Sequence, residues 1–158
     1  MGNKFILYYL LIILITSVLY SCSEKLFFES KLEIPNQIWE SEKAAVFDFN
    51  ITDTLSAYNL TIGLLNTNDY RNSNLWLFVY TSIDKRIIAA DTLEYFLYNE
   101  KGKCLGESNG DTWLHEFRYG LGVRFPQTGK YTVKIVQGMR ESKLKGIKQL
   151  GLKIEKIK

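Results

Sequence analysis

The feature that most restricts the fold of this chain is an apolar–polar alternation with a period of two residues. Phe47, Phe49 and Ile51 alternate with polar residues, and the same period recurs from Tyr58 to Leu64. Successive side chains of a β-strand point to opposite faces, so each segment is expected to be a strand with one buried face. After residue 21 no segment keeps the i, i+3, i+4, i+7 spacing of an amphipathic helix.

Short polar stretches separate these expected strands. The segment 75–80 is apolar on both faces, which predicts a central strand with Trp76, Phe78 and Tyr80 in the core. Asp53 to Ser56 could join its two flanking strands as a hairpin. Residues 111–121 fit either a strand with a bulge or a short helix. Further strands are expected at 93–97, 131–135 and 150–154. We therefore predict an all-β, antiparallel sandwich of about seven to nine strands, Ig-like or jelly-roll-like.

The first residues are typical of a bacterial lipoprotein signal. Lys4 precedes an unbroken apolar run over 5–15, and Leu19 and Ser21 stand three and one positions before Cys22. The apolar run is shorter than the roughly 20 residues of a bilayer span, so a cleaved signal over residues 1–21 fits better than an uncleaved anchor helix. Lipidation is expected at Cys22.

Cleavage at Cys22 divides the chain into three parts. Residues 1–21 are the signal, residues 22–30 are expected to be a lipidated tether, and residues 31–158 are expected to form a single sandwich domain. Several acyl chains on one residue hold a protein on a membrane essentially permanently, because each buried methylene contributes about 0.8 kcal/mol. Cys104 is the other cysteine, so an intramolecular disulfide is not expected.

Charge is unevenly distributed. The net charge of +3 is too small to predict nucleic-acid binding. The last twenty residues nevertheless hold seven basic side chains and two glutamates. Lysines at these positions are typical of an exposed strand edge that is protected against further pairing. They fit equally a face that meets anionic lipid headgroups or an acidic partner. The candidate contact residues are Arg140, Lys143, Lys145 and Lys148.

The residues give little sign of catalysis. His115 is the only histidine, so no histidine pair can hold a metal ion, and Cys104 lacks the flanking residues of a family of thiol enzymes. No glycine-rich phosphate loop is present. We therefore expect no catalytic residue, no metal, no cofactor and no small-molecule substrate.

An ordered series of segments resembles one family over essentially the whole chain after the signal. The segments are IPNQIW (34–39), FNITDT (49–54), YRNSNLWLF (70–78), DTLE (91–94), FPQTGKY (125–131) and QGMR (137–140). In this order they are similar to the gliding-motility lipoprotein GldH family of the Bacteroidetes. Only the lipidated cysteine transfers as a functional residue, onto Cys22. Two further segments, around Thr54 and Thr92, resemble the acceptor pattern for O-glycosylation of exported proteins in that phylum.

The resemblance implies a non-enzymatic, accessory or assembly role among envelope proteins of the gliding and type IX secretion machinery. Residues 23–25 match poorly the acidic run associated with surface export, which favours a periplasm-facing domain on the outer membrane. The alternative is a glycan-binding module of a surface polysaccharide-handling system. Exposure of at least two of Trp39, Trp76 and Trp113 on one concave face would favour that alternative.

Overall fold

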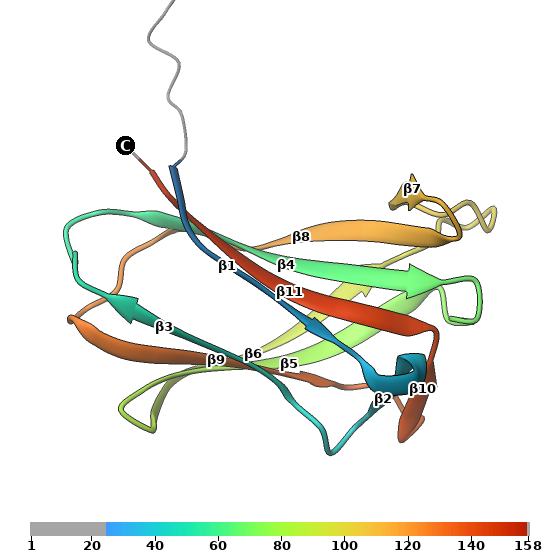
Figure 1. The fold of residues 1–158 in the computed structure, drawn as a ribbon, viewed down its shortest axis with the longest axis horizontal. Coiled ribbons are helices and arrows are strands. Elements are labelled where there is room, and N and C mark those ends of the chain that lie inside the picture. Colours follow the sequence, from blue (N-terminus) through green and yellow to red (C-terminus); the bar gives the residue numbers. More distant parts are fainter. Residues whose placement is uncertain (1–24, 158) are drawn as a thin grey trace, which may run out of the picture.

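The computed structural model describes residues 25–157, which form eleven strands and one 3-10 turn. All strand pairs are antiparallel, so the predicted all-β antiparallel sandwich is confirmed (Figure 1). Three of the eleven strands have only three residues each, which is why there are more strands than we expected. The elements are β1 (Lys25–Glu33), η1 (Pro35–Gln37), β2 (Ile38–Glu40), β3 (Ala45–Ile51), β4 (Tyr58–Thr67), β5 (Asn74–Ile83), β6 (Arg86–Phe96), β7 (Glu107–Asn109), β8 (Thr112–Val123), β9 (Gly129–Gln137), β10 (Lys143–Lys145) and β11 (Ile147–Lys156).

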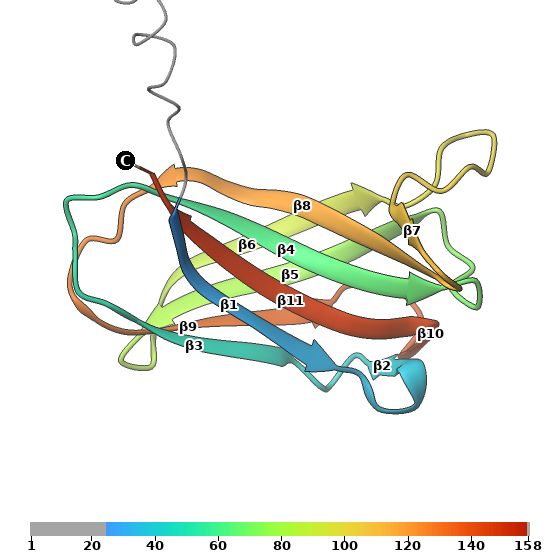
Figure 2. The ribbon, with the colours of Figure 1, turned by 45° about the horizontal axis from the view of Figure 1, so that its top comes forward.

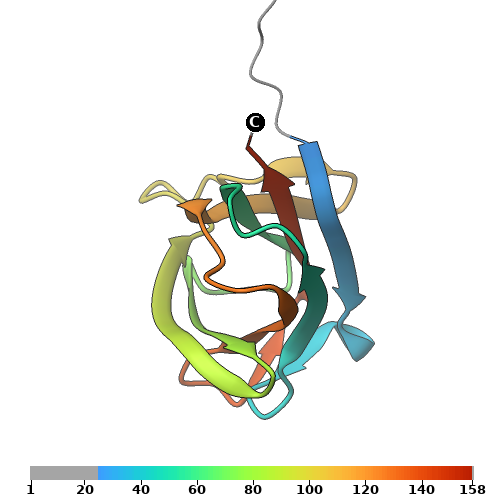
Figure 3. The ribbon, with the colours of Figure 1, turned by 90° about the vertical axis from the view of Figure 1, so that its left-hand side faces the viewer.

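Two main sheets face one another across the core. One has the strand order β1-β11-β4-β8-β7 and the other β3-β9-β5-β6, while β2 and β10 form a small ribbon at one end. The end-on view in Figure 3 shows the two layers curving around the interior. No helix within residues 25–157 is long and apolar enough to cross a membrane.

The period of two in the sequence becomes the inward face of each strand. In β3 the buried and exposed residues alternate without interruption, and β4 alternates buried with half-buried residues. Removing a Leu or Phe side chain from water contributes roughly 1.5–3 kcal/mol, so these stripes drive the two sheets together. The strand expected at 150–154 lies within β11, where Leu150, Leu152 and Ile154 are fully buried.

Strand β11 brings the two ends of the described chain together. It lies between β1 and β4, and the register pairs Lys25 with Lys156 and Lys156 with Tyr58 (Figures 1 and 2). The connections 52–57, 84–85 and 124–128 lie at this end of the sandwich, which we call the proximal end. The opposite, distal end holds the β2–β10 ribbon and the connections 68–73, 97–106 and 138–142. Ten-residue strands such as β4 separate the two ends by about 30 Å.

Three expectations differ from the structure, and one open alternative is decided by it. Residues 25–30, expected to be tether, form most of β1 and pair with β11, so the sandwich begins before residue 31. The segments before and after Asp53 do not form a hairpin, because β3 and β4 belong to opposite sheets. Residues 112–123 form one strand, β8, with register shifts opposite Leu60, which agrees with the bulged-strand alternative.

The third difference concerns β5. It is a central strand as predicted, lying between β9 and β6. Its second face does not enter the core, however, because Trp76 is 37% exposed and Phe78 is 36% exposed. No layer of the described structure covers the outer face of this sheet. The apolar residues on both faces of β5 therefore do not mean that both faces are buried.

The turn between β10 and β11 gives a sharp test of the distal packing. Gly146 has a φ of +78°, and a Cβ there would lie 2.3 Å from the Tyr70 backbone nitrogen. Gly146→Ala is expected to destabilise the protein by about 2–5 kcal/mol, from left-handed strain plus overpacking. Gly110→Ala is the matched control, because its φ is +67° and no atom lies within 4 Å of the added Cβ. The control should lose only about 1–2 kcal/mol in urea unfolding; equal losses would contradict the packing described here.

Candidate functional site

The residues predicted from the sequence to carry function lie far apart. Cys22 lies outside the described residues. Thr54 is half-buried in the proximal connection between β3 and β4, and Thr92 is exposed on the outer face of β6. Both threonines therefore stay predictions as O-glycosylation sites.

The basic candidates gather at the distal end. Lys143 and Lys145 are exposed on β10 on either side of buried Leu144, Arg140 is exposed in the preceding connection, and Lys148 is half-buried in β11. Within residues 25–157 none of the four basic side chains takes part in an ion pair. The Lys-Leu-Lys order on a two-stranded ribbon fits edge protection, and the unpaired charges leave a contact role open as a proposal.

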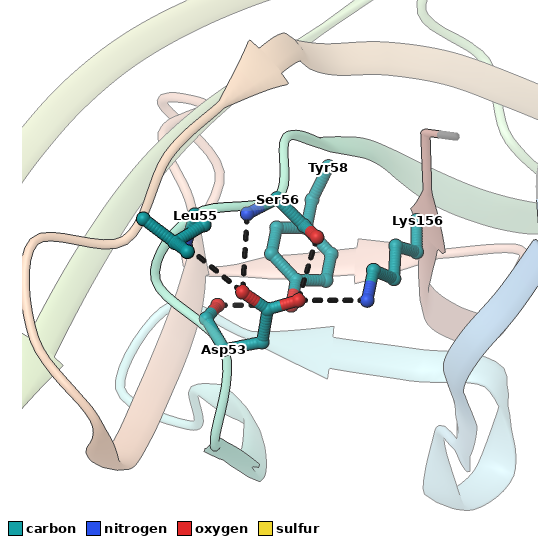
Figure 4. Close-up of polar contacts among 5 residues, drawn as sticks. All are labelled: Asp53, Leu55, Ser56, Tyr58 and Lys156. Carbon is teal, nitrogen blue, oxygen red and sulfur yellow. Dashed lines mark hydrogen bonds and ion pairs between the residues drawn. The ribbon is translucent and has the colours of Figure 1, made fainter.

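The densest polar cluster lies at the proximal end and was missed by the sequence analysis (Figure 4). The Asp53 carboxylate accepts hydrogen bonds from the Leu55 and Ser56 backbone N–H groups at 2.9 and 3.2 Å. It also accepts the Ser56 hydroxyl at 2.6 Å and the Lys156 ammonium at 2.7 Å. The Tyr58 hydroxyl donates to the Asp53 carbonyl at 3.1 Å.

These contacts fix the charge of the cluster. The Lys156 ammonium, and then the Ser56 hydroxyl and two backbone N–H groups, hold the pKa of Asp53 well below its usual range. The same hydrogen bond raises the pKa of Lys156. A carboxylate kept ionised in this way is a poor proton donor or acceptor near neutral pH. The cluster therefore acts structurally: it ties the turn after β3 to the last strand, β11.

The fold also brings Cys104 and His115 together, which their separation of eleven residues did not predict. The Cys104 sulfur lies 3.7 Å from His115 Nε2. His115 is buried and stacks on Phe117, and burial lowers its pKa, so the imidazole is neutral. A neutral imidazole does not supply the positive charge that stabilises a reactive thiolate. Among residues 25–157, no three His, Cys, Asp or Glu side chains lie close enough to hold a metal ion.

The three tryptophans do not form a sugar-stacking platform. Trp39 is buried, and its indole N–H donates to the Lys43 carbonyl at 2.7 Å. Trp76 is exposed on β5, whereas half-buried Trp113 belongs to β8 of the other sheet and donates to Asn68 at 2.9 Å. Within the described residues, no two exposed tryptophans lie together on one concave face. The glycan-binding alternative therefore lacks its expected feature.

Two open hollows adjoin one another at the distal end. Their volumes are about 610 and 600 Å³, and both are lined by Phe96, Tyr98, Asn99 and Glu100. Phe96 is 59% exposed, and Leu105, which lines the second hollow, is 56% exposed. Large exposed apolar side chains beside a hollow are typical of a contact site. The sequence analysis did not single out these residues, because nothing in their spacing shows that they meet.

Comparison with known proteins identifies the family. The profile of the GldH lipoprotein family matches residues 26–154. The chain belongs to the GldH lipoprotein family. The "Gliding motility lipoprotein GldH homolog" of Christiangramia forsetii is 33% identical over 153 residues, covering 92% of this chain and 93% of that protein. The "Gliding motility lipoprotein GldH" of Flavobacterium johnsoniae is 31% identical over 152 residues, covering 92% and 94%. The resemblance seen in the sequence is thereby confirmed for this GldH family member.

Solved structures resemble this GldH-family chain only weakly. The infectious bursal disease virus VP2 subviral particle has a TM-score of 0.44 at 14% identity, covering 87% of this chain and 34% of that one. The tomato aspermy virus structure has a TM-score of 0.39 at 12% identity, covering 87% and 80%. These low scores carry no argument about fold or function.

The Asp53 cluster predicts a specific dependence of stability on pH. Asp53→Asn removes a carboxylate whose pKa is lowered on folding. A lowered pKa stabilises the folded state above the unfolded value, about 3.9, and this contribution is lost as the pH falls toward the folded value. The variant should therefore melt at a lower temperature than the wild type at pH 7, and the difference should narrow below about pH 4.

The control for this experiment is Asp111→Asn, because Asp111 is exposed and its carboxylate makes no hydrogen bond or ion pair within residues 25–157. Its melting curves should follow the wild type at every pH. A difference for Asp53→Asn that stays constant from pH 7 to pH 2 would show that the ionised carboxylate is not what stabilises the turn.

Proposed function

We propose that this protein is a lipid-anchored, non-enzymatic component of the gliding-motility and type IX secretion machinery. It sits on the outer membrane, faces the periplasm, and acts as an accessory or assembly protein through contacts with other envelope proteins. The observation that carries the proposal is family membership across residues 26–154, together with two relatives that are named gliding-motility lipoproteins.

The proposed lipid anchor at Cys22 determines which end of the domain lies near the membrane. Two residues separate Cys22 from Lys25, so their Cα atoms are three steps and at most about 11 Å apart. Lys25 begins β1 at the proximal end, beside the C-terminal end of β11. An acylated Cys22 therefore keeps the proximal end near the membrane and directs the distal end, about 30 Å away, toward neighbouring proteins.

This orientation bears on the basic residues. Arg140, Lys143 and Lys145 belong to the distal end, so they face away from the headgroups beside the anchor. An acidic surface on a partner protein is then the better candidate for them. Tethering confines the domain to a thin layer near the membrane, which raises its effective concentration for partners there. Interfaces of modest area are then sufficient to bind these partners.

The proposal is tested in the native host by deleting the gene and supplying it again on a plasmid. Deletion should abolish spreading on agar and reduce the set of secreted proteins, and the wild-type gene should restore both. Cys22→Ser should restore neither and should no longer incorporate a fatty-acid probe, because the anchor holds the domain in place. The wild-type gene in the same plasmid is the matched control.

Two outcomes would contradict the proposal. A deletion strain with normal spreading and secretion would remove the gliding role. Full rescue by an unlabelled Cys22→Ser protein would show that membrane attachment is not needed.

A further inference from the structure

Strand β6 is an unusually open edge. It ends the four-stranded sheet, and β5 is its single strand neighbour in the described structure. Figure 3 shows it at the rim of its layer, with no strand beyond it. Ile87 is 61% exposed and Ile88 39% exposed near its start. Eight of its eleven residues are exposed, and the three half-buried ones, Ala89, Leu93 and Tyr95, lie on its inner face.

Proteins generally protect such edges with lysine, proline, bulges or short length. Strand β6 contains neither lysine nor proline, and its one register shift lies at its beginning, opposite Thr81 and Ser82. Asp91 is directed toward the inner side of the sheet, as edge-protecting charges often are, but its carboxylate already accepts the Tyr119 hydroxyl at 2.8 Å.

The other edges are better protected. Strand β1 carries a bulge and four charged residues, and β7 has only three residues. The edge of β3 has seven residues and lies beside β1, where the rings of Phe28 and Phe49 are 5.4 Å apart. The longer β6 also contacts the facing sheet, through Tyr95 stacked on Phe117 at 4.1 Å, but this contact is made by side chains of its inner face and, within the described residues, leaves its main chain unpaired on the outer edge. The part of β8 beyond β7 is interrupted near Gly122, whose φ is +62°. Among the described strands, β6 is therefore the one long, regular edge that could accept another strand.

A side-chain site lies directly at the end of this edge. Phe96, the last residue of β6, lines both distal hollows together with Tyr98. A strand added beside β6 would reach these hollows with its terminal side chain. Strand addition uses main-chain hydrogen bonds for affinity and such pockets for specificity.

The charges on β6 define the partner further. Glu94 is exposed on the outer face of its second half, where it accepts a hydrogen bond from Asn74 at 2.6 Å, and Asp91 lies on the inner face, hydrogen-bonded to Tyr119. Oppositely charged residues on neighbouring strands stabilise a sheet, so a segment with basic residues on its outer face fits beside Glu94. We propose that β6 binds an extended segment of another envelope protein by strand addition, with basic residues along the segment and an aromatic or aliphatic side chain in the distal hollows.

A second copy of this chain fits the edge less well. If two β6 strands paired antiparallel over their full length, Asp91 would stand opposite Asp91. Like charges directly opposite one another destabilise a sheet. A segment with lysines at these positions avoids this repulsion.

This proposal deepens the proposed function and rests on it, because the partner is expected among the same envelope proteins. Its test uses the purified, lipidated full chain in detergent, so a failure leaves the gliding and secretion experiment unaffected. The probe is the synthetic peptide TVKVKVTF, which combines strand-forming residues, two lysines and a terminal phenylalanine. The control peptide, TVKPKVTF, has a central proline that cannot donate a main-chain hydrogen bond.

Two measurements are made on the wild-type protein. Fluorescence anisotropy should show that the probe binds and that the proline peptide binds at least about tenfold more weakly, because a strand ladder needs its N–H donors. Hydrogen–deuterium exchange should show slower exchange in residues 86–96 on adding the probe, with no change in β1 or β3.

A pair of variants locates the site. Ala90→Lys with Thr92→Lys places two charges on the exposed face of β6, where they protect the edge and repel the lysines of the probe. This double variant should bind at least about tenfold more weakly while keeping the wild-type melting temperature. Asn50→Lys, on the exposed face of the opposite edge strand β3, is the matched control and should bind as the wild type does.

Three results would overturn the proposal. The first is no difference in binding between the two peptides. The second is protection by the probe at strands other than β6. The third is protection of residues 86–96 that grows with protein concentration when no peptide is present, which would assign the edge to a second copy of the chain.

Discussion

The antiparallel insertion of β11 between β1 and β4 is the constraint on which the rest of this structure depends. Leu150, Leu152 and Ile154 of this strand are fully buried, so the last strand of the chain is also part of the centre of the core. Within residues 25–157, removing β11 would take from β1 the one strand that it pairs with and from β4 one of its two partner strands. Pairings between such distant parts of a chain are costly in loop entropy, and burial of this strand offsets that cost.

The same pairing determines which end of the sandwich lies beside the start of β1. It brings Lys25 beside Lys156, and Asp53 then ties the β3–β4 turn to Lys156. In the proposed arrangement, the segment after a lipidated Cys22 leads into this end of the sandwich. The hollows, the unpaired basic side chains and the Phe96 end of β6 gather at the other end. In the proposed arrangement, anchoring and recognition are separated by the length of the strands.

Much of this architecture could be predicted from local patterns. The period of two residues located β3, β4, β9 and β11, because each buries one face; an unbroken apolar run located β5, and the ordered segments identified the family. Periodicity could not show which strands pair. It suggested a hairpin across Asp53 where the chain changes sheets, and it gave no sign of β1, whose residues 25–30 are consecutive apolar and charged residues.

The contact surfaces were the least predictable part. Apolar residues on both faces of β5 indicated burial, yet Trp76 and Phe78 lie on an uncovered face, because coverage depends on layers that a strand's own sequence does not encode. The nearness of Cys104 to His115 and the free edge of β6 arise from sheet order in the same way. Local sequence reveals which side chains can be buried, and only the topology decides which remain available to a partner.

The central claim, that the anchored and recognition ends are opposite, is tested most directly by spin labels on the lipidated protein in vesicles containing a nickel-chelating lipid. In a Cys104→Ser background, Leu55→Cys labels the proximal end and Lys101→Cys labels the distal connection; both side chains are exposed. We predict strong relaxation by the surface nickel at position 55 and little at position 101. Equal relaxation at both positions, or the reverse order, would contradict this account.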